Sequence, residues 1–266
     1  MKHERIALTC PGAFLDTYFL SASKELKRSM CRPAVIVCPG GGYAYVADGE
    51  AEPIAMALCG RRFHACVLRY PCAPARFPAA LCALAEAVAW VRAGAAENHV
   101  DPRQISVCGF SAGGHLAGSL GVFWNAPFLA AETGLVPQDM RPDKMVLCYP
   151  VITGGEFAHK GSFDNLLGAD ADAARRAEVS LEQHVTQDTP PAFLWHTYTD
   201  PGVPVENTML FAMALRRAGV PFESHIYSVG GHGLSLANEL TENTAGAGVQ
   251  AECTGWVDLA AGWLRR

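Results

Sequence analysis

Short apolar runs alternate along the chain with longer segments in which apolar residues recur at helical spacing. A strand that is covered on both faces carries hydrophobic side chains throughout, so the short runs predict buried strands. An earlier run at residues 13–20 predicts an antiparallel strand at the sheet edge. Strands that alternate with helices are typical of a mainly parallel sheet with helices on both faces, which makes the predicted fold class α/β. The predicted central strands are residues 34–38, 65–70, 104–110, 144–149, 192–198 and 222–228.

The segments between these strands carry apolar stripes at helical spacing. One stripe predicts an amphipathic helix after Pro78, and a second predicts a helix over residues 205–218 that stops at Gly219. A third predicts the last helix of the chain. No repeat or linker interrupts the pattern, so residues 1–266 predict a single domain. The stripes consist of Leu81, Leu84, Val88 and Val91; Leu210, Ala214 and Leu215; and Trp256, Leu259, Trp263 and Leu264.

One connection, residues 153–191, is longer than is usual between the elements of an α/β domain. It contains an Ala-, Asp- and Arg-rich piece at residues 169–178 that favours a helix. Two interpretations stay open. The segment is either an ordinary connector with one extra helix or a small cap over the active site that limits the size of the substrate.

Composition narrows the class of protein. Half of the residues are hydrophobic and 18% are charged, as in compact globular enzymes. The formal net charge of −5 and the scattered Lys and Arg residues argue against a nucleic-acid partner. The ten cysteines include no C-x-x-C pair, and several lie within predicted strands. They predict reduced, buried thiols without disulfides or a metal site, and with them a cytoplasmic location.

The amino terminus is basic and then apolar, as in a signal peptide, but Pro11 and Gly12 break the run and Asp16 ends it. No apolar stretch reaches the roughly 18–20 residues of a membrane span. We therefore expect neither a membrane-spanning segment nor a membrane partner. The oligomeric state stays open, and a homo-oligomer is compatible with the sequence.

The pentapeptide at residues 109–113 reads Gly-Phe-Ser-Ala-Gly and matches G-x-S-x-G. A predicted strand precedes it and a predicted helix, residues 114–120, follows it, which is the context of a nucleophile elbow. The flanking glycines allow the sharp turn that exposes a serine hydroxyl at the start of a helix. Ser111 is therefore the predicted nucleophile.

A glycine-rich loop follows the first central strand at residues 39–43. Together with the backbone N–H of Ala112, the N–H groups of Gly41 and Gly42 are predicted to form an oxyanion hole. The alternative is a dinucleotide-binding loop, but the G-x-G-x-x-G spacing fails at Tyr45 and no P-loop lysine follows.

Nine histidines compete for the role of general base. In α/β hydrolases the order along the chain is Ser, Asp or Glu, then His. His232 fits, because it lies in a glycine-rich loop after the last predicted strand. His115 is expected to support the serine turn, His225 to be structural, and His196 to support the site from within the preceding strand.

The acid that orients the histidine is expected at the carboxyl end of the strand before that loop. Asp200 directly follows residues 192–198. Glu206 is the nearest alternative, but it begins the next predicted helix, where an acid favours the helix dipole. Asp188 precedes the strand and lies at its wrong end. Asp200 is therefore the predicted acid of the triad.

Two aromatic residues are candidates for the substrate pocket. Tyr43 lies beside the glycine loop and Trp124 follows the predicted helix after the serine. Ordinary packing explains each of them equally well.

These motifs together resemble the bacterial acetyl-xylan-esterase-like branch of the α/β-hydrolase esterases, from about Arg32 onwards. In that family the serine of GFSAGG, the aspartate before VPVEN and the histidine of GGHG form the triad. The resemblance implies hydrolysis of short acyl esters, especially acetyl groups on sugars such as xylo-oligosaccharides. Related lipases carry H-G-G-G in the oxyanion loop, whereas Pro39 takes the histidine position here. The stretches that carry the resemblance are PAVIVCPGGGYAYVADGEAEPIAMAL, RYPCAPARFPAALCALAEAVAWVR, ISVCGFSAGGHLAGSLG, PPAFLWHTYTDPGVPVENTMLFAMALRRAGVPFESHIY and GGHGLSLA.

The sequence thus predicts a serine esterase that acts on a small-molecule ester through an acyl-enzyme, without a metal or organic cofactor. A serine peptidase with the same triad is one alternative, although prolyl-peptidase relatives usually carry a further large domain. A non-catalytic binding protein of the same fold is the other, although such proteins typically have a damaged triad.

Overall fold

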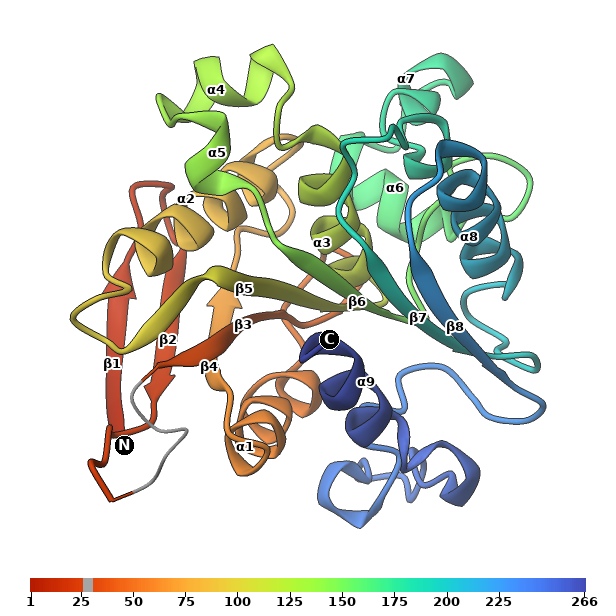
Figure 1. Ribbon diagram of the computed structural model, residues 1–266. Coiled ribbons are helices and arrows are strands. Elements are labelled where there is room, and N and C mark those ends of the chain that lie inside the picture. Colours follow the sequence, from red (N-terminus) through yellow and green to blue (C-terminus); the bar gives the residue numbers. More distant parts are fainter. Residues whose placement is uncertain (26–30) are drawn as a thin grey trace.

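The computed structural model describes residues 1–25 and 31–266, which build one eight-stranded sheet (Figure 1). The strands lie in the order β1-β2-β4-β3-β5-β6-β7-β8. All neighbouring pairs from β4 to β8 are parallel, whereas β1 and β2 pair antiparallel with each other and β2 pairs antiparallel with β4. The strands are β1 Lys2–Ala7, β2 Phe14–Phe19, β3 Arg32–Cys38, β4 His64–Arg69, β5 Val100–Phe110, β6 Lys144–Cys148, β7 Ala192–Thr197 and β8 Phe222–Tyr227.

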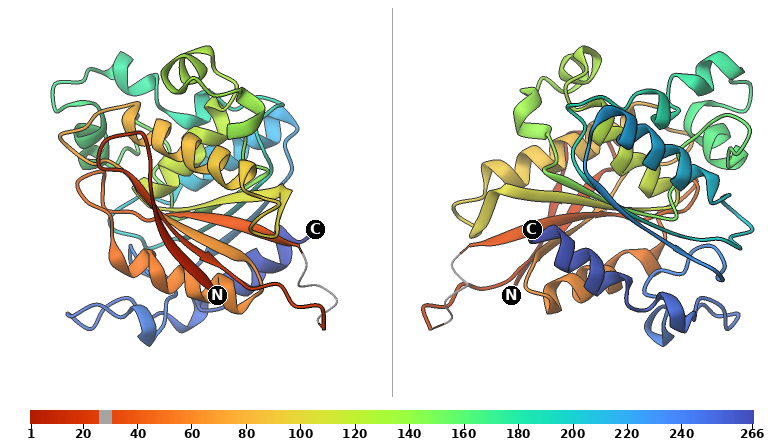
Figure 2. Two further views of the ribbon diagram at one scale, coloured as in Figure 1. Left: turned by 90° about the vertical axis from the view of Figure 1, so that its left-hand side faces the viewer. Right: turned by 45° about the vertical axis from the view of Figure 1, so that its right-hand side comes forward.

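Helices cover both faces of this sheet. Figures 1 and 2 show α1 and α9 on one face, and α2, α3 and α8 on the other, with the shorter helices farther out. The predicted α/β class is confirmed. The helices are α1 Glu52–Gly60, α2 Ala79–Ala93, α3 Ala112–Phe123, α4 Pro127–Thr133, α5 Pro137–Met140, α6 Lys160–Leu167, α7 Ala173–Ala177, α8 Glu206–Ala218 and α9 Trp256–Leu264.

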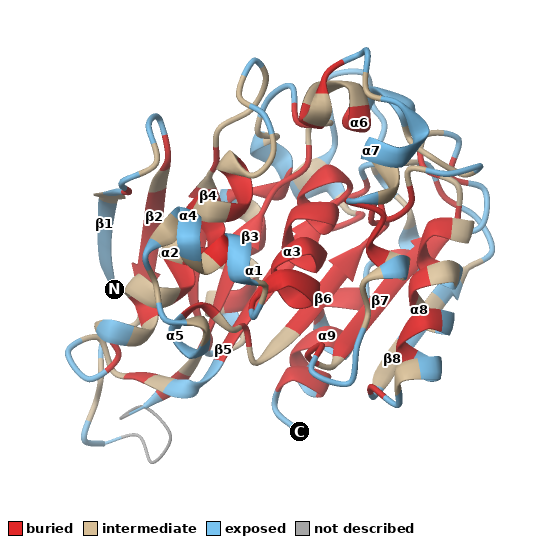
Figure 3. Ribbon diagram, turned by 90° about the horizontal axis from the view of Figure 1, so that it is seen from above, coloured by how far each residue is buried: buried red, intermediate tan, exposed pale blue. Residues whose placement is uncertain are grey.

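The central strands separate two hydrophobic cores. Along β3, Ile36 packs into the core beneath α2 and α3, whereas Val35 and Val37 pack into the core beneath α1 and α9. Figure 3 shows that the central strands and α3 are buried almost throughout. Burial on both faces explains why these strands are apolar at nearly every position, as the sequence predicted.

The predicted early strand is present as β2, but it does not lie at the edge. It pairs with β4 on one side and with β1 on the other. Strand β1 has the sequence KHERIA and is exposed at nearly every position. An edge strand without a buried face carries no apolar alternation, so hydrophobic patterning does not detect it.

The predicted long helices are present as α2, α8 and α9, and Gly219 ends α8 in a left-handed conformation (φ 74°). Two stripe residues differ from the prediction. Leu210 is half-buried, and Leu259 is 42% exposed because its neighbours Val257 and Ala260 take the inward positions of α9. The helix expected over residues 169–178 is shorter and is limited to α7.

The long connection of residues 153–191 contains α6 and α7 and lies on the same side of the sheet as α3 and α8 (Figure 2). The ten cysteines, all of which the structure describes, are free. Among the described helices, none combines the length and the apolar character that crossing a membrane requires.

Candidate active site

Ser111 lies at the turn between β5 and α3 in a backbone conformation that is rare for residues other than glycine (φ 51°, ψ −119°). The flanking glycines make this turn sterically possible. A Cβ at Gly109 would lie 2.1 Å from the carbonyl oxygen of Gly113, and a Cβ at Gly113 would lie 2.0 Å from that of Cys38. The strand–turn–helix geometry is that of a nucleophile elbow.

Ser111, His232 and Asp200 meet at the carboxyl ends of β5, β7 and β8. His232 Nε2 lies 2.7 Å from Ser111 Oγ, and His232 Nδ1 lies 2.7 Å from Asp200 Oδ2. A carboxylate only accepts hydrogen bonds, so Nδ1 carries the proton and donates to it. Nε2 is then unprotonated and accepts from the Ser111 hydroxyl. The imidazole is therefore held in the tautomer that a general base at Nε2 requires.

The Asp200 carboxylate is held by the turn that follows β7. Its Oδ1 accepts from the backbone N–H groups of Gly202 at 2.8 Å and Val203 at 2.9 Å. Burial favours the neutral acid, but hydrogen bonds from His196 and His232 outweigh it and hold the pKa of Asp200 well below its usual range. The Asp200 carboxylate is thus ionised at neutral pH.

His196 supports this carboxylate from within β7, in the position that the sequence suggested. Its Nε2 donates to the carbonyl oxygen of Val203 at 3.0 Å and lies 3.3 Å from Asp200 Oδ2. Its Nδ1 lies 2.8 Å from Thr208 Oγ1. Because Nε2 carries the proton, Nδ1 accepts from the threonine hydroxyl. The Nε2–H of His196 therefore faces both the Val203 carbonyl oxygen and the Asp200 carboxylate.

The glycine loop of residues 39–43 lies against the serine turn. A Cβ at Gly40 would lie 3.0 Å from the Cβ of Ser111. Gly41 and Gly42 have positive φ values of 118° and 63°, and a Cβ at Gly41 would lie 2.1 Å from the carbonyl oxygen of Tyr45. In the described part of the chain, the backbone N–H groups of Gly41, Gly42 and Ala112 have no hydrogen-bond acceptor. These N–H groups are thus available to a ligand.

A cleft of about 540 Å³ opens above Ser111 and His232. Besides Gly41, Gly42, Ser111 and His232, its lining consists of residues that sequence reasoning did not assign to the site, among them Tyr45, Glu50 and His159. Tyr45 was detectable as a second aromatic residue beside the glycine loop. The full lining comprises Gly41, Gly42, Tyr45, Ala47, Gly49, Glu50, Ser111, His159, His232, Gly233, Ser235, Thr241 and Asn243.

The two aromatic residues considered for the pocket lie elsewhere. Tyr43 is 3% exposed, and its hydroxyl lies 2.8 Å from His115 Nδ1. Trp124 is 7% exposed, and its Nε1 donates to the carbonyl oxygen of Asp188 at 3.1 Å. Neither residue lines the cleft, so ordinary packing in the interior accounts for both. Tyr45, two residues beyond Tyr43, occupies the rim instead.

The side chains of His115 and His225 contact other parts of the fold, so a role of His115 in supporting the serine turn stays a prediction. His115 Nε2 donates to the carbonyl oxygen of Val179 at 2.8 Å, so Nδ1 accepts from the Tyr43 hydroxyl. Burial lowers the pKa of His115 to about 4. His225 lies in β8, where its Nε2 is 3.1 Å from Glu223 Oε1. Neither imidazole lines the cleft.

His159 immediately precedes α6 and lines the cleft. Its Nδ1 accepts a hydrogen bond from the backbone N–H of Ser162 at 3.3 Å and lies 2.8 Å from the Ser162 hydroxyl. A backbone N–H can only donate, so in neutral His159 the proton resides on Nε2. Burial, followed by the nearby His232, lowers the pKa of His159 and favours this neutral form. No acceptor for Nε2 lies among the described residues.

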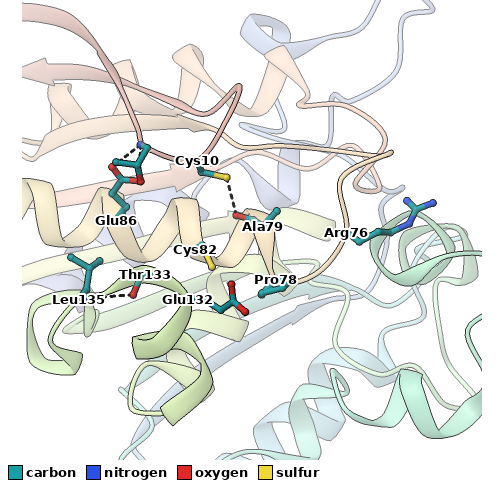
Figure 4. Close-up of a pocket in the computed structure, with 10 residues that line it drawn as sticks. Cys10, Arg76, Pro78, Ala79, Cys82, Glu86, Glu132, Thr133 and Leu135 are labelled. Atoms are coloured by element: carbon teal, nitrogen blue, oxygen red, sulfur yellow. Dashed lines mark hydrogen bonds between the residues drawn. The ribbon is translucent and has the colours of Figure 1, made fainter.

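A second cavity of about 440 Å³ lies between α2, α4 and the connection from β1 to β2 (Figure 4). Its lining includes Cys10, Cys82 and Glu86 but none of the predicted site residues. Glu86 already accepts from the backbone N–H of Thr9, and burial raises the pKa of both thiols, which disfavours the nucleophilic thiolate. In the parts of the chain described, no three metal-ligating side chains gather at one point.

The chain is similar to known proteins over most of its length. The family model described as BD-FAE matches residues 20–215. The chain is 38% identical to endo-1,4-beta-xylanase B of Butyrivibrio fibrisolvens over 78% of its length, and 28% identical to an acetylxylan esterase of Xylanibacter ruminicola over 76%. The structure of an acetyl ester-xyloside bifunctional hydrolase from Caldicellulosiruptor lactoaceticus superposes with a TM-score of 0.84 at 37% identity, covering 98% of this chain and 95% of the other.

This chain covers only part of the curated relatives but nearly all of the solved structure. The chain spans 33% of the length of the curated xylanase and 41% of the curated acetylxylan esterase, but nearly all of the solved hydrolase. Further relatives and structural neighbours are named esterases and carboxylesterases. By its family match and these similarities, the chain belongs to the BD-FAE family and has the α/β-hydrolase fold.

Proposed function

We propose that this protein hydrolyses short-chain acyl esters, with Ser111 as nucleophile, His232 as general base and Asp200 as the acid that orients the imidazole. The observation that carries the proposal is the continuous hydrogen-bond chain from carboxylate to imidazole to hydroxyl, with two links of 2.7 Å each. The tautomer that this chain imposes leaves Nε2 ready to accept the hydroxyl proton.

In the acylation step, Ser111 Oγ attacks the ester carbonyl while its proton moves to His232 Nε2. The N–H groups of Ala112 and of Gly41 or Gly42 stabilise the oxyanion of the tetrahedral intermediate. The imidazolium then donates its proton to the departing alcohol as the carbon–oxygen bond breaks. Water, deprotonated by His232, attacks the acyl-enzyme in the second step and releases the acid and the free serine.

For the natural substrate we propose acetyl groups on sugars such as xylo-oligosaccharides. The proposal draws support from the names of the relatives, an acetylxylan esterase and an acetyl ester-xyloside hydrolase. The cleft lining is compatible with a polar leaving group. Tyr45 is 63% exposed at the rim and offers a ring face, while His159 offers an Nε2–H without an acceptor among the described residues.

We also propose that residues 1–266 act as one catalytic domain in which residues 153–191 form a small cap. The support is that His159, from this segment, lines the same cleft as Ser111. Replacement of His159 by Ala is then expected to raise KM for acetylated xylo-oligosaccharides more than KM for p-nitrophenyl acetate, because only the sugar provides hydroxyl acceptors for Nε2–H.

The decisive experiment is a turnover series on p-nitrophenyl esters of increasing acyl length, with and without Ser111→Ala. We expect the highest kcat/KM for the acetyl ester and a loss of about a thousandfold or more in the variant, with its fold retained. Near-normal turnover by Ser111→Ala would refute the assignment of the nucleophile.

The two alternatives need their own measurements. A peptidase of the same fold would turn over aminoacyl anilides faster than acetyl esters. A non-catalytic binding protein would not react with a fluorophosphonate probe, whereas a triad-activated serine is labelled at Ser111 and loses the label in Ser111→Ala.

A further inference from the structure

Glu50 is a buried carboxylate that the mechanism above does not use. It lies in the 3-10 turn Asp48–Glu50, is 6% exposed and borders the same cleft as Ser111 and His232. Its Oε2 accepts from the backbone N–H of Gly40 at 2.7 Å, and its Oε1 accepts from the Tyr149 hydroxyl at 2.6 Å. Both oxygens therefore face donors, which is the arrangement that suits an ionised carboxylate.

Tyr149 continues this network toward the loop that carries His232, residues 228–237, which we call the histidine loop. The Tyr149 hydroxyl accepts from the backbone N–H of Ser235 at 2.8 Å and so directs its own proton to Glu50. Its ring packs edge-on against the imidazole of His232, with the ring centroids 5.1 Å apart. Ser235 is fixed in turn by Trp256, whose Nε1 donates to its carbonyl oxygen at 2.8 Å.

The hydrogen bonds from Gly40 through Glu50 and Tyr149 to Ser235 thus join the glycine loop to the histidine loop. Both loops take part in the proposed acylation step. One end of the network holds Gly40, the first glycine of the glycine loop, and the next two glycines line the cleft. The other end holds Ser235, three residues beyond His232. Hydrogen bonds to a charged acceptor are stronger than those between neutral groups, so this carboxylate fixes both loops more firmly than a neutral residue can.

The charge of Glu50 also bears on the imidazole. The titratable groups that face His232 are Asp200, Tyr149, Glu50 and His159. Burial leaves the pKa of Glu50 raised, although the hydrogen bonds from Tyr149 and Gly40 and the proximity of His232 act in the opposite direction and favour its ionised form. An ionised Glu50 is a second negative charge close to the imidazolium that forms during attack.

We propose that Glu50 is a positioning residue that ties the glycine loop to the histidine loop through Tyr149 and stabilises the imidazolium of His232 by its charge. This inference rests on the proposed function, because it assigns a role beside the Ser111–His232–Asp200 triad. It predicts that the carboxylate acts on kcat and on the protonation of the base, not on the affinity for the ester.

The test compares Glu50→Gln with Glu52→Gln, an exposed acid two residues away that removes the same charge outside the cleft. A glutamine cannot accept from both Gly40 and Tyr149. With p-nitrophenyl acetate we expect kcat of Glu50→Gln to fall about tenfold or more, while KM changes less than about twofold. We also expect the acid limb of kcat/KM to move to lower pH by about half a unit, because protonating the imidazole loses a nearby negative charge. Glu52→Gln leaves both measurements unchanged.

Tyr149→Phe supplies an independent variant, which also decides the matter if Glu50→Gln fails to fold. It keeps the ring against His232 and the charge of Glu50 but removes the hydroxyl between the loops. We expect kcat to fall about threefold to tenfold, with the acid limb in place. Full activity of either variant overturns the proposal, and so does an unmoved acid limb in folded Glu50→Gln. If Ser111→Ala abolishes activity while Glu50→Gln does not affect it, only this inference fails; if Ser111→Ala stays active, the proposed function fails.

Discussion

The two oxygens of Asp200 have different partners, and this difference determines what an Asp200→Asn substitution does. Oδ1 accepts from two backbone N–H groups, so the amide oxygen of an asparagine stays there and its NH₂ group faces His232. The imidazole must then accept at Nδ1 and carry its proton on Nε2, where it cannot accept from Ser111. We expect kcat for p-nitrophenyl acetate to fall about 10⁴-fold.

The matched control is Asp188→Asn, which changes an exposed acid before β7. It leaves kcat unchanged, and the melting temperatures of both variants establish that they are folded. Retention by Asp200→Asn of more than about a hundredth of the wild-type kcat would show that another group orients the imidazole, with Glu206 the alternative left by the sequence.

Among single residues, those in sequence motifs were predictable, whereas those that reach the site through contacts distant in the sequence were not. Ser111 and His232 stand in glycine-flanked motifs at strand ends, and the structure brings them within hydrogen-bond distance. Glu50 carries no such signal. It resembles Glu52, an acid at the start of a helix, and only its burial and its contacts with Gly40 and Tyr149, which the folded chain creates, distinguish the two. His159 likewise reaches the cleft through the folding of a connection that the pattern does not specify.

At the scale of elements, the packing of α3 on β3 depends on a glycine. A Cβ at Gly113 would lie 2.0 Å from the carbonyl oxygen of Cys38 and 2.3 Å from that of Pro39, both of them backbone atoms that cannot rotate away. We expect Gly113→Ala to lower the free energy of unfolding by about 3 kcal/mol or more, or to prevent folding. Urea unfolding measures this loss.

The matched substitution Gly262→Ala lies in α9, where a Cβ would meet nothing within 4 Å. It should be neutral or stabilise by up to about 1 kcal/mol, because alanine is the better helix former. Equal stability of the two variants would mean that α3 is free to shift away from β3.

Elements with a buried face were predictable from hydrophobic patterning, whereas the exposed strand β1 was not. The central strands and α2 carry the apolar periodicity that burial demands, whereas β1 is an exposed edge strand that presents none. Its place beside β2 depends on backbone pairing and on contacts such as Arg5 Nε with Asp16 Oδ1 at 2.8 Å. Such contacts follow from register, which hydrophobic patterning does not determine when both faces of a strand are exposed.

At the scale of the whole molecule, two buried histidines make the fold sensitive to acid. His64 Nδ1 accepts from the backbone N–H of Leu20 at 3.0 Å, and His115 Nδ1 accepts from the Tyr43 hydroxyl. Protonation of His64 Nδ1 places a donor against the backbone N–H of Leu20, which can only donate, and protonation of His115 Nδ1 removes the acceptor of the Tyr43 hydroxyl. Burial lowers the pKa of each imidazole to about 4. The unfolded chain, with histidine pKa near 6.5, therefore binds more protons below that pH.

The free energy of unfolding therefore falls as the pH decreases. The stabilisation by neutral His64 and His115 is fully present above pH 6.5 and is lost progressively as the pH falls toward 4. We expect the free energy of unfolding to drop by about 2 kcal/mol per histidine between pH 7 and pH 5, measured by urea denaturation. His64→Gln keeps one side-chain acceptor and one donor but does not titrate, so it removes about half of the drop. His3→Gln, at an exposed position, leaves the drop intact. Equal stability of the wild-type protein at the two pH values would mean that water or structural relaxation accommodates both imidazolium ions.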